Sequence, residues 1–460
     1  MIEGLKPYAE YKESRLPWLG RCPKHWSLRR TKILFQERVQ KGFPDEPLLA
    51  ATQTKGVVRK EDYETRTVTA QKDLHLLKLV EIGDYVISLR SFQGGIEVAH
   101  YRGIISPAYT VLKPRKAVAT GYYSHFFKSK QFIDSLSLFV TGIREGQNID
   151  YRRLSRVEMP LPLPDEQVAI VRFLDHANRK IDSFIRAKRK LIGLLNEQKQ
   201  AIIHRAVTRG LNPDVPLKPS GIPWIGDIPA HWEARKLGSL FLRHGSGTTP
   251  SGDAYYGGGV PWVMSGDLKD DLLVTTKRTV TESALKDFSA LKLHPKGSLL
   301  VAMYGATIGK TGVLNMAACS NQACCALASP RSTVNPVFIQ SIVIMARPHL
   351  MQQAYGGGQP NINAEVVRSL RVPLPPLAEQ DSILAYLDGA TIPLNTAIAR
   401  TEREIALMQE YRTRLTTDIV TGKLDVREAA AKLPELPSDD TPEPVVDELL
   451  EESELETNQE

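Results

Sequence analysis

The longest regular pattern of apolar positions lies between residues 164 and 209, a stretch that no proline interrupts after its first residue. Apolar side chains recur there in steps of 3, 4 or 7 residues, close to 3.5 per turn, which is typical of helices that pair in a coiled coil. The preceding PLPLP cannot be helix interior, because proline lacks an N–H and fixes φ. The pattern therefore predicts a helix of roughly 65–70 Å that starts after these prolines.

A second pattern of the same kind follows 213 residues later. We interpret the two as long helices that pack as an antiparallel coiled coil; one separate amphipathic helix in each of two domains is the alternative. Pro393 should kink or restart the second helix. The positions predicted to pair the helices are Ile181, Ile185, Ile192, Leu195 and Ile202 with Leu394, Ile398, Ile405, Met408 and Leu415.

The helices belong to a tandem repeat. PWLGRCPKHW, from Pro17, recurs as PWIGDIPAHW from Pro223, and MPLPLPDEQVAIVRFLD, from Met159, recurs as VPLPPLAEQDSILAYLD from Val372. The segments between these blocks, 31–141 and 237–353, share little. A duplicated core would explain the repeat but not the divergence of its middles, so the variable segments are the better candidates for function.

The variable segments read as mixed α/β. DYVISL and GSLLVAMYG predict strands, whereas YYSHFFKSKQFIDSLSLFVTG and FIQSIVIMARPHLMQQAYGGG each predict a helix. We expect an α/β (α+β) protein with two domains, each followed by a long helix, and a disordered acidic tail. The expected boundaries are 1–155 and 212–368 for the domains, 156–211 and 369–425 for the helices, and 426–460 for the tail.

The distribution of charge along the chain indicates the class of molecule that the protein binds. The net charge is +7, but residues 431–460 hold one basic and eleven acidic residues, which leaves +17 on residues 1–430. A body this basic favours a polyanion, most simply nucleic acid, although a basic surface without a ligand is the alternative. With 42% apolar and 24% charged residues the chain is neither fibrous nor wholly disordered.

Cysteine usage and hydropathy favour the cytoplasm. Four cysteines form no CxxC pair, no apolar run approaches the length of a membrane span, and the first residues lack the apolar stretch of an export signal. We therefore expect a reduced cytoplasmic protein without structural zinc.

Segments of the sequence that resemble catalytic motifs depart from the residues or the spacing that those motifs require. GATIGKTG at Gly305–Gly312 encloses three residues between its glycines where a P-loop needs four, so a Gly-rich turn that meets a phosphate backbone is the better interpretation. Asn335-Pro336-Val337-Phe338 departs from the Asn-Pro-Pro-Phe of amino-methyltransferases and reads as a strand-to-helix turn. The histidines show no metal-binding spacing. We predict no catalytic residue and no metal site.

The repeated blocks resemble the specificity subunit of type I restriction–modification systems. The resemblance covers almost all of residues 8–425, through PWLGRCPKHW, PWIGDIPAHW and the two helix starts, and through GATIGKTGV and SNQACCAL in the second variable segment. The first variable segment departs from this pattern, because RSFQGGIEV at Arg90–Val98 occupies the place of GATIGK without its lysine.

The resemblance implies a non-catalytic DNA-binding subunit. Each variable segment would be a target-recognition domain for one half of a bipartite double-stranded target, and the helices would set the spacer. Two methyltransferase subunits, which bind S-adenosylmethionine, would dock on the repeated helices. Two restriction subunits, which use ATP and Mg, would complete a type I site-specific deoxyribonuclease, and this chain would bind no cofactor itself.

Base edges are read by forked polar side chains, and phosphates are bound by Lys and Arg. The candidate DNA-binding residues are the polar, basic and aromatic residues of loops: Thr248, Thr249, Ser251, Tyr255, Tyr256, Lys269, Tyr304, Thr307, Lys310, Asn321 and Gln322 in the second segment, and Arg59, Arg66, Arg90, Ser91, Gln93 and Arg102 in the first. Tyr255 and Tyr256 could equally be packing aromatics. A free-standing methyltransferase or nuclease and a scaffold that binds only proteins are the competing hypotheses.

Overall fold

The computed structural model describes residues 5–53, 55–62, 73–89, 91–115, 118, 120–141, 148–356 and 360–434. The chain forms two compact units: the first unit comprises residues 1–189 and 402–460, and the second unit residues 190–401. Each unit therefore holds one variable segment and a part of both long helices. Among the described residues no helix combines the length and apolarity needed to cross a membrane.

The first unit is built on an antiparallel sheet with the strand order β4 (Phe35–Arg38), β11 (Thr110–Pro114), β8 (Tyr85–Ile87) and β9 (Glu97–Val98). β8 lies within the predicted strand DYVISL, and all three of its residues are buried. Two-stranded pairs surround the sheet: β1 (Tyr11–Glu13) with β2 (Arg21–Pro23), β3 (Ser27–Arg30) with β14 (Glu158–Leu161), β5 (Leu49–Thr52) with β6 (Gly56–Arg59), β7 (Lys78–Val80) with β10 (Gly103–Ile105), and β12 (Val140–Thr141) with β13 (Asn148–Ile149).

Short helices complete this unit. They are α1 (Thr31–Leu34), α2 (Ser91–Gly94), α3 (Thr120–Phe127), α4 (Lys130–Leu136) and α5 (Tyr151–Leu154), with 3-10 turns η1 (Lys60–Asp62), η2 (Leu74–Leu76) and η3 (Ser137–Phe139). Its core is aromatic: Phe35, Tyr85, Tyr123 and Phe127 pack ring against ring. Large buried side chains therefore fasten α3 to the sheet, and Phe132 packs α4 against α3. Such side chains are the main source of hydrophobic stabilisation.

The second unit repeats this plan with longer strands. Its five-stranded sheet has the order β18 (Phe241–Ser246), β25 (Cys324–Pro330), β22 (Leu299–Ala302), β23 (Thr311–Leu314) and β20 (Asp271–Leu273). A three-stranded sheet joins β21 (Arg278–Val280), β19 (Tyr256–Val263) and β24 (Cys319–Ser320), and two pairs join β15 (Leu217–Pro219) with β16 (Asp227–Pro229) and β17 (Glu233–Lys236) with β26 (Arg371–Leu374). β22 lies within the predicted strand GSLLVAMYG and is buried at every position.

The helices of the second unit are α7 (Glu282–Asp287), α8 (Pro336–Met345), α9 (Arg347–Gln352) and α10 (Ala364–Ser369), with 3-10 turns η4 (Leu237–Leu240), η5 (Asp253–Tyr255), η6 (Ser265–Asp267) and η7 (Gly305–Thr307). The expected single helix that follows the last sheet strand is divided in both units, into α3 and α4 and into α8 and α9. Ser129, extended at ψ 138°, separates the first pair. Pro348 lies in the first turn of α9, where its missing N–H costs no helical hydrogen bond.

The repeated sequence blocks meet each other in each unit. β3 follows the first PW block and pairs with β14, which leads into the long helix α6 (Pro164–Arg209); β17 and β26 make the same pair ahead of α11 (Leu377–Val420). Trp26 and Trp232, the last residues of the two PW blocks, are both completely buried. The repeat therefore builds the same junction between sheet and long helix twice.

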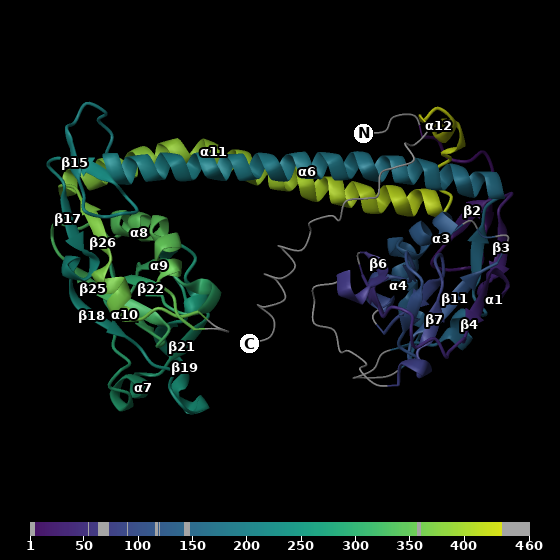
Figure 1. The fold of residues 1–460 in the computed structure, drawn as a ribbon, viewed down its shortest axis with the longest axis horizontal. Coiled ribbons are helices and arrows are strands. Elements are labelled where there is room, and N and C mark those ends of the chain that lie inside the picture. The colour runs from purple at the N-terminus through teal and green to yellow at the C-terminus, as the bar shows by residue number, and fades with distance from the viewer. Residues whose placement is uncertain are drawn as a thin grey trace. The chain divides into compact units, whose positions relative to one another are not determined.

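Within each unit, the parts of α6 and α11 that belong to it run side by side (Figure 1). In the first unit Arg412 binds Asp182, and the Lys188 ammonium lies 2.6 Å from a Glu404 carboxylate oxygen. In the second unit Lys199 donates to the Asn395 side-chain oxygen at 2.8 Å. Partner numbers fall in α11 as they rise in α6, so the helices are antiparallel, as predicted.

The predicted pairing positions are less exposed than neighbouring apolar residues of the same helices. Ile181, Ile185 and Leu415 are buried, and the other seven are half-buried. Leu194 and Leu407, which were not assigned to the pairing face, are 53% and 55% exposed. This difference in exposure agrees with the predicted pairing face.

Two further expectations need correction. Of the kink or restart expected at Pro393, the restart does not occur, because α11 continues through this residue. Both Pro393 and Gly389, whose carbonyl loses its hydrogen bond there, are exposed, so water can satisfy that oxygen. The expected disordered tail begins too early at residue 426, because α12 (Arg427–Ala431) folds and places Val426 and Ala430 in the first unit's core. Residues 435–460 lie outside the described residues.

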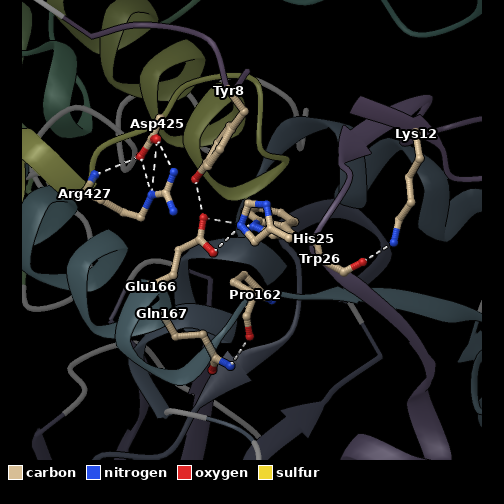
Figure 2. Close-up of polar contacts among 9 residues, drawn as sticks. All are labelled: Tyr8, Lys12, His25, Trp26, Pro162, Glu166, Gln167, Asp425 and Arg427. Atoms are coloured by element: carbon tan, nitrogen blue, oxygen red, sulfur yellow. Dashed lines mark hydrogen bonds and ion pairs between the residues drawn. The ribbon is translucent and has the colours of Figure 1, made fainter. Parts of the chain in front are cut away.

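A buried carboxylate fastens the start of α6 to the N-terminal segment (Figure 2). The Glu166 side chain, 2% exposed, accepts hydrogen bonds from the Tyr8 hydroxyl at 2.6 Å and the Trp26 indole N–H at 2.9 Å, and His25 Nε2 lies 2.9 Å from its other oxygen. Arg427, ion-paired with Asp425, lies over the Tyr8 ring.

The second unit has a weaker version of this cluster. Glu379 occupies the position of Glu166 in the repeat, is 28% exposed, and has His231 as its hydrogen-bond partner at 2.8 Å. The buried indole N–H of Trp232 has no hydrogen-bond partner among the described residues. The same sequence block therefore builds a closed carboxylate cluster in the first unit and an open one in the second.

Candidate nucleic-acid interface

One edge of the five-stranded sheet gathers loops from four parts of the second unit. Strand directions explain this, because the ends of β18 and β22 and the starts of β25, β23 and β20 all lie at the same edge. We call the loops there the second loop edge: residues 247–251, 269–270, 303–310 and 321–323. They contain the predicted residues Thr248, Thr249, Ser251, Lys269, Tyr304, Thr307, Lys310, Asn321 and Gln322.

Hydrogen bonds join these loops into one surface. Thr249 Oγ1 donates to Gln322 Oε1 at 2.8 Å, and the Gly247 N–H donates to the Asn321 carbonyl at 3.2 Å. The Met303 N–H donates to the Ala323 carbonyl at 2.9 Å. A Cβ at Gly247 would lie 1.5 Å from the Ser320 carbonyl oxygen, so only glycine allows the 247–251 loop to approach β24 so closely.

The β22–β23 loop (residues 303–310) presents Lys310 to solvent. Gly305 and Gly309 have φ of +58° and +75°, and Thr307 Oγ1 donates to the Tyr304 carbonyl at 2.7 Å. The loop connects two antiparallel strands, whereas a P-loop connects a strand to a helix. The geometry agrees with a Gly-rich turn that offers a lysine to an anion, whereas the Thr307 hydroxyl is used inside the turn.

Tyr255 and Tyr256 support the second loop edge. The Tyr256 hydroxyl donates to the Pro250 carbonyl at 2.8 Å, and its ring packs edge-on against Trp262. The Tyr255 hydroxyl donates to Asp287 at 3.0 Å, and its ring meets Phe288 edge-on. Both rings are half-buried, so the structure favours the packing interpretation for these two tyrosines.

The first unit has an equivalent edge. The ends of β4 and β8 and the starts of β11 and β9 lie together. We call the segments next to these strand ends, residues 39–42, 88–89, 91–96 and 106–109, the first loop edge. The β8–β9 loop, described except for residue 90, occupies the place of the β22–β23 loop and exposes Gln93. Ser91 is 1% exposed and accepts a hydrogen bond from the Ser88 N–H at 2.8 Å, so it stabilises the start of α2. Arg66 and Arg90 lie outside the described residues.

The other two arginines predicted in the first segment differ in their charge environment. The Arg102 guanidinium binds Glu46 at 2.8 Å and Glu81 at 2.5 Å, so two carboxylates offset its charge. Arg59 is exposed, lies over the Tyr101 ring at 5.1 Å, and has the Glu61 carboxylate at 3.8 Å. Of the two, Arg59 is the better placed to meet a polyanion.

The rejected catalytic motif has a structural role. Asn335 caps α8: its side-chain oxygen accepts from the Val337 N–H at 3.0 Å, and its amide donates to Asp381 at 2.8 Å. Within the described part of the chain no three His, Cys, Asp or Glu side chains are grouped so that they could hold a metal ion. The four cysteines are free and buried. Burial raises the pKa of the Cys325 thiol to about 12, which leaves it unreactive.

Comparisons with known proteins agree on one family. The sequence profile described as the type I restriction modification DNA specificity domain matches residues 229–405. The chain is 22% identical over 438 residues to the putative type I restriction enzyme MjaX specificity subunit of Methanocaldococcus jannaschii, which covers 89% of this chain and 96% of that protein. It is 21% identical over 360 residues to the type I restriction enzyme MjaIX specificity subunit of the same organism, which covers 76% and 80%.

One solved structure shares the fold over most of both chains. It comes from work on complex assembly and conformational transition of the type I R-M system, and it matches with a TM-score of 0.65 at 17% identity, over 88% of this chain and 99% of that chain. The similarity confirms the predicted combination of mixed α/β segments and long helices. Together the matches confirm the resemblance carried by the repeated sequence blocks.

Proposed function

We propose that this chain is a specificity subunit of a type I restriction–modification system, the family to which its matches point, and that it reads a bipartite target in double-stranded DNA. The first loop edge reads one half-site and the second loop edge reads the other. The observation that carries this proposal is the gathering of polar loops at one edge of each sheet. Phosphate contacts position a protein on DNA, whereas side chains that reach base edges choose the sequence.

At the second loop edge the two roles fall to different residues. Lys269 and Lys310 are exposed cations suited to phosphates, and Lys310 can also reach a guanine. Gln322 carries an exposed forked amide that pairs with a base edge, and Thr249 orients it through its hydrogen bond. Asn321 is half-buried and its side-chain oxygen accepts from the Ala323 N–H at 3.2 Å, so it offers its amide N–H groups to a base. At the first loop edge Gln93 is the equivalent exposed amide.

The long helices have two roles: they set the distance between the half-sites, and they bind partner subunits. α6 and α11 set the spacer between the half-sites, and their repeated sequence offers two similar surfaces to two identical methyltransferase subunits. Restriction subunits, two in number, join afterwards. S-adenosylmethionine is bound by the methyltransferase partner, ATP and Mg by the restriction partner, and this chain contributes recognition without a catalytic group. The substrate of the complex is DNA. We place the complex in the cytoplasm.

An exchange of residues 237–353 for the matching segment of another specificity subunit tests this function. In complex with the methyltransferase partner, the exchanged protein should methylate a target in which one half-site has changed, while the other half-site and the spacer persist. The physical reason is that the second loop edge lies wholly within the exchanged segment, whereas the pairing faces of α6 and α11 do not. A map of methylated bases is the measurement.

The matched control exchanges residues 31–141 instead and should change the opposite half-site. If either exchange altered both half-sites together, the assignment of one half-site to each loop edge would be wrong. If the unmodified complex methylated a continuous target without a spacer, the bipartite model itself would fail.

Lys310→Ala tests the β22–β23 loop. If Lys310 meets a phosphate, binding should weaken about equally for all sequences, and the slope of log K against log salt should become shallower by about one. If it reads a guanine, the loss should be about 1–3 kcal/mol and confined to one position of the site. Fluorescence anisotropy at several salt concentrations distinguishes the two roles.

Lys296→Ala is the control for this change. Lys296 is also exposed but precedes β22, at the opposite edge of the sheet, and its loss should leave affinity and salt slope nearly unchanged. Equal behaviour of the two variants would remove Lys310 from the interface.

A further inference from the structure

We propose that Lys128 and Arg347, outside the predicted DNA-binding set, are the positioning residues of the two loop edges: each holds the recognition loop of its unit in the conformation that reads DNA. The inference rests on the proposed function and assigns specificity to two side chains behind the loops. It follows from two contact patterns in which different residues perform the same task.

In the first unit Lys128 stands at the junction of α3 and α4. Its ammonium donates to the Gly94 carbonyl and to the Gln53 carbonyl, both at 2.8 Å, and forms an ion pair with Glu97. Gly94 belongs to the β8–β9 loop, Gln53 to the turn between β5 and β6, and Glu97 begins β9. One cation therefore joins three segments at the first loop edge.

In the second unit Arg347 stands at the corresponding junction of α8 and α9. Its guanidinium donates to the Gly309 carbonyl at 3.2 Å and to Asp270 Oδ1 at 2.6 Å. The same Asp270 oxygen accepts from the Thr311 N–H at 3.0 Å and lies 3.1 Å from Thr311 Oγ1. Arg347 and Asp270 thus hold the end of the β22–β23 loop, one residue from Lys310.

In each unit a glycine allows the loop to lie close to the junction between the two helices. Gly95 has φ +85°, and a Cβ there would lie 2.2 Å from the Phe127 carbonyl oxygen at the end of α3. Gly309 has φ +75°, and a Cβ there would lie 2.9 Å from Arg347 Cγ. Both loops need glycine for the same two reasons, a left-handed backbone and a close approach.

Each of the two cations already has a carboxylate as its partner. The Glu97 side chain is 3% exposed, and burial raises its pKa to about 7 while Lys128 acts to lower it. Arg347 shares Asp270 with a backbone N–H, and both residues of this pair are about a quarter exposed. The buried Glu97 carboxylate is costly to leave without its cation, and loss of the Arg347 guanidinium removes the hydrogen bonds that join Gly309 and Asp270 to α9. Removing either cation should therefore release the loop that it holds. Lys310, in contrast, presents its ammonium to solvent.

The test uses Lys128→Met and Arg347→Met in the full chain assembled with its methyltransferase subunits. Binding is selected from a library of randomised DNA duplexes, and the base preference at each position of both half-sites is measured. Each variant should lose about tenfold or more in discrimination at one half-site, the two variants at opposite ones, because discrimination by a well-placed fork is of that size. The salt slope should stay that of the unmodified complex, since neither cation meets a phosphate.

Matched controls remove the same charge elsewhere. Lys130→Met acts two residues from Lys128 on an exposed side chain, and Arg371→Met acts on an exposed side chain of β26. Both should leave both half-sites unchanged. The conservative variants Lys128→Arg and Arg347→Lys retain the cation and should recover a large part of the discrimination. Should a methionine variant fail to assemble, Glu97→Gln and Asp270→Asn weaken the same pairs while keeping their shape, and the same loss is expected from them.

Three results separate the possible failures. Unchanged base preferences in both methionine variants, with a bipartite motif for the unmodified complex, would overturn the positioning role and leave the proposed function intact. A salt slope shallower by about one would make the altered cation a phosphate contact and would also overturn it. An unmodified complex that selects no bipartite motif would refute the proposed function first, and this inference with it.

Discussion

Replacing Glu166 with alanine should lower the free energy of unfolding of the first unit by about 3–5 kcal/mol, because a buried charged acceptor is removed from its partners. The Tyr8 hydroxyl and the Trp26 indole N–H would lose their common acceptor inside the protein, and His25 would lose its carboxylate. The N-terminal segment and the segment around Arg427 would be loosened together, since both pack around Tyr8. Urea denaturation of the full chain measures the loss.

The tandem repeat supplies the control at an equivalent position. Glu379→Ala removes a carboxylate that is 28% exposed and has His231 as its partner, so the loss should stay below about 1 kcal/mol. Similar losses at the two positions would mean that the closed cluster in the first unit adds nothing to stability.

Replacing Ile185 with aspartate should cost a similar amount, about 3–5 kcal/mol, because it places an unpaired charge on the covered face between α6 and α11. Ile185 is 6% exposed, and it lies between Asp182 and Lys188, both of which bind α11 in the first unit. The expected result is a lower urea midpoint together with weaker assembly with the methyltransferase subunits.

Leu407→Asp is the control on the same helix pair. Leu407 lies on α11 within the first unit and is 55% exposed, so the change should alter stability by no more than about 0.5 kcal/mol. Equal effects of the two substitutions would mean that Ile185 does not lie on the pairing face.

The arrangement of helices and repeats was predictable because it depends on local periodicity. The spacing of Ile181, Ile185 and their partners 213 residues later follows one helix face, and a helix converts that spacing into a stripe whatever surrounds it. The restart considered at Pro393 and the disordered tail expected from residue 426 were wrong, because exposure to water decides the first and packing against a distant core decides the second. Neither the exposure of Pro393 nor the packing of the segment after residue 426 can be predicted from the neighbouring residues in the sequence.

The tandem repeat, the two long helices and the resemblance to specificity subunits could be read from the order of the amino acids, and so could the polar residue types that a DNA-reading loop needs. Which of those residues lie together depends on the fold. Strand order brings Thr249 beside Gln322, although 73 positions separate them in the chain. Burial withdraws Ser91 from any ligand, and two carboxylates offset the charge of Arg102. Lys128 and Arg347 carry no sequence signal, because their role depends on what their charged ends reach after the chain has folded, and contacts across a sheet edge leave no periodic trace in the sequence.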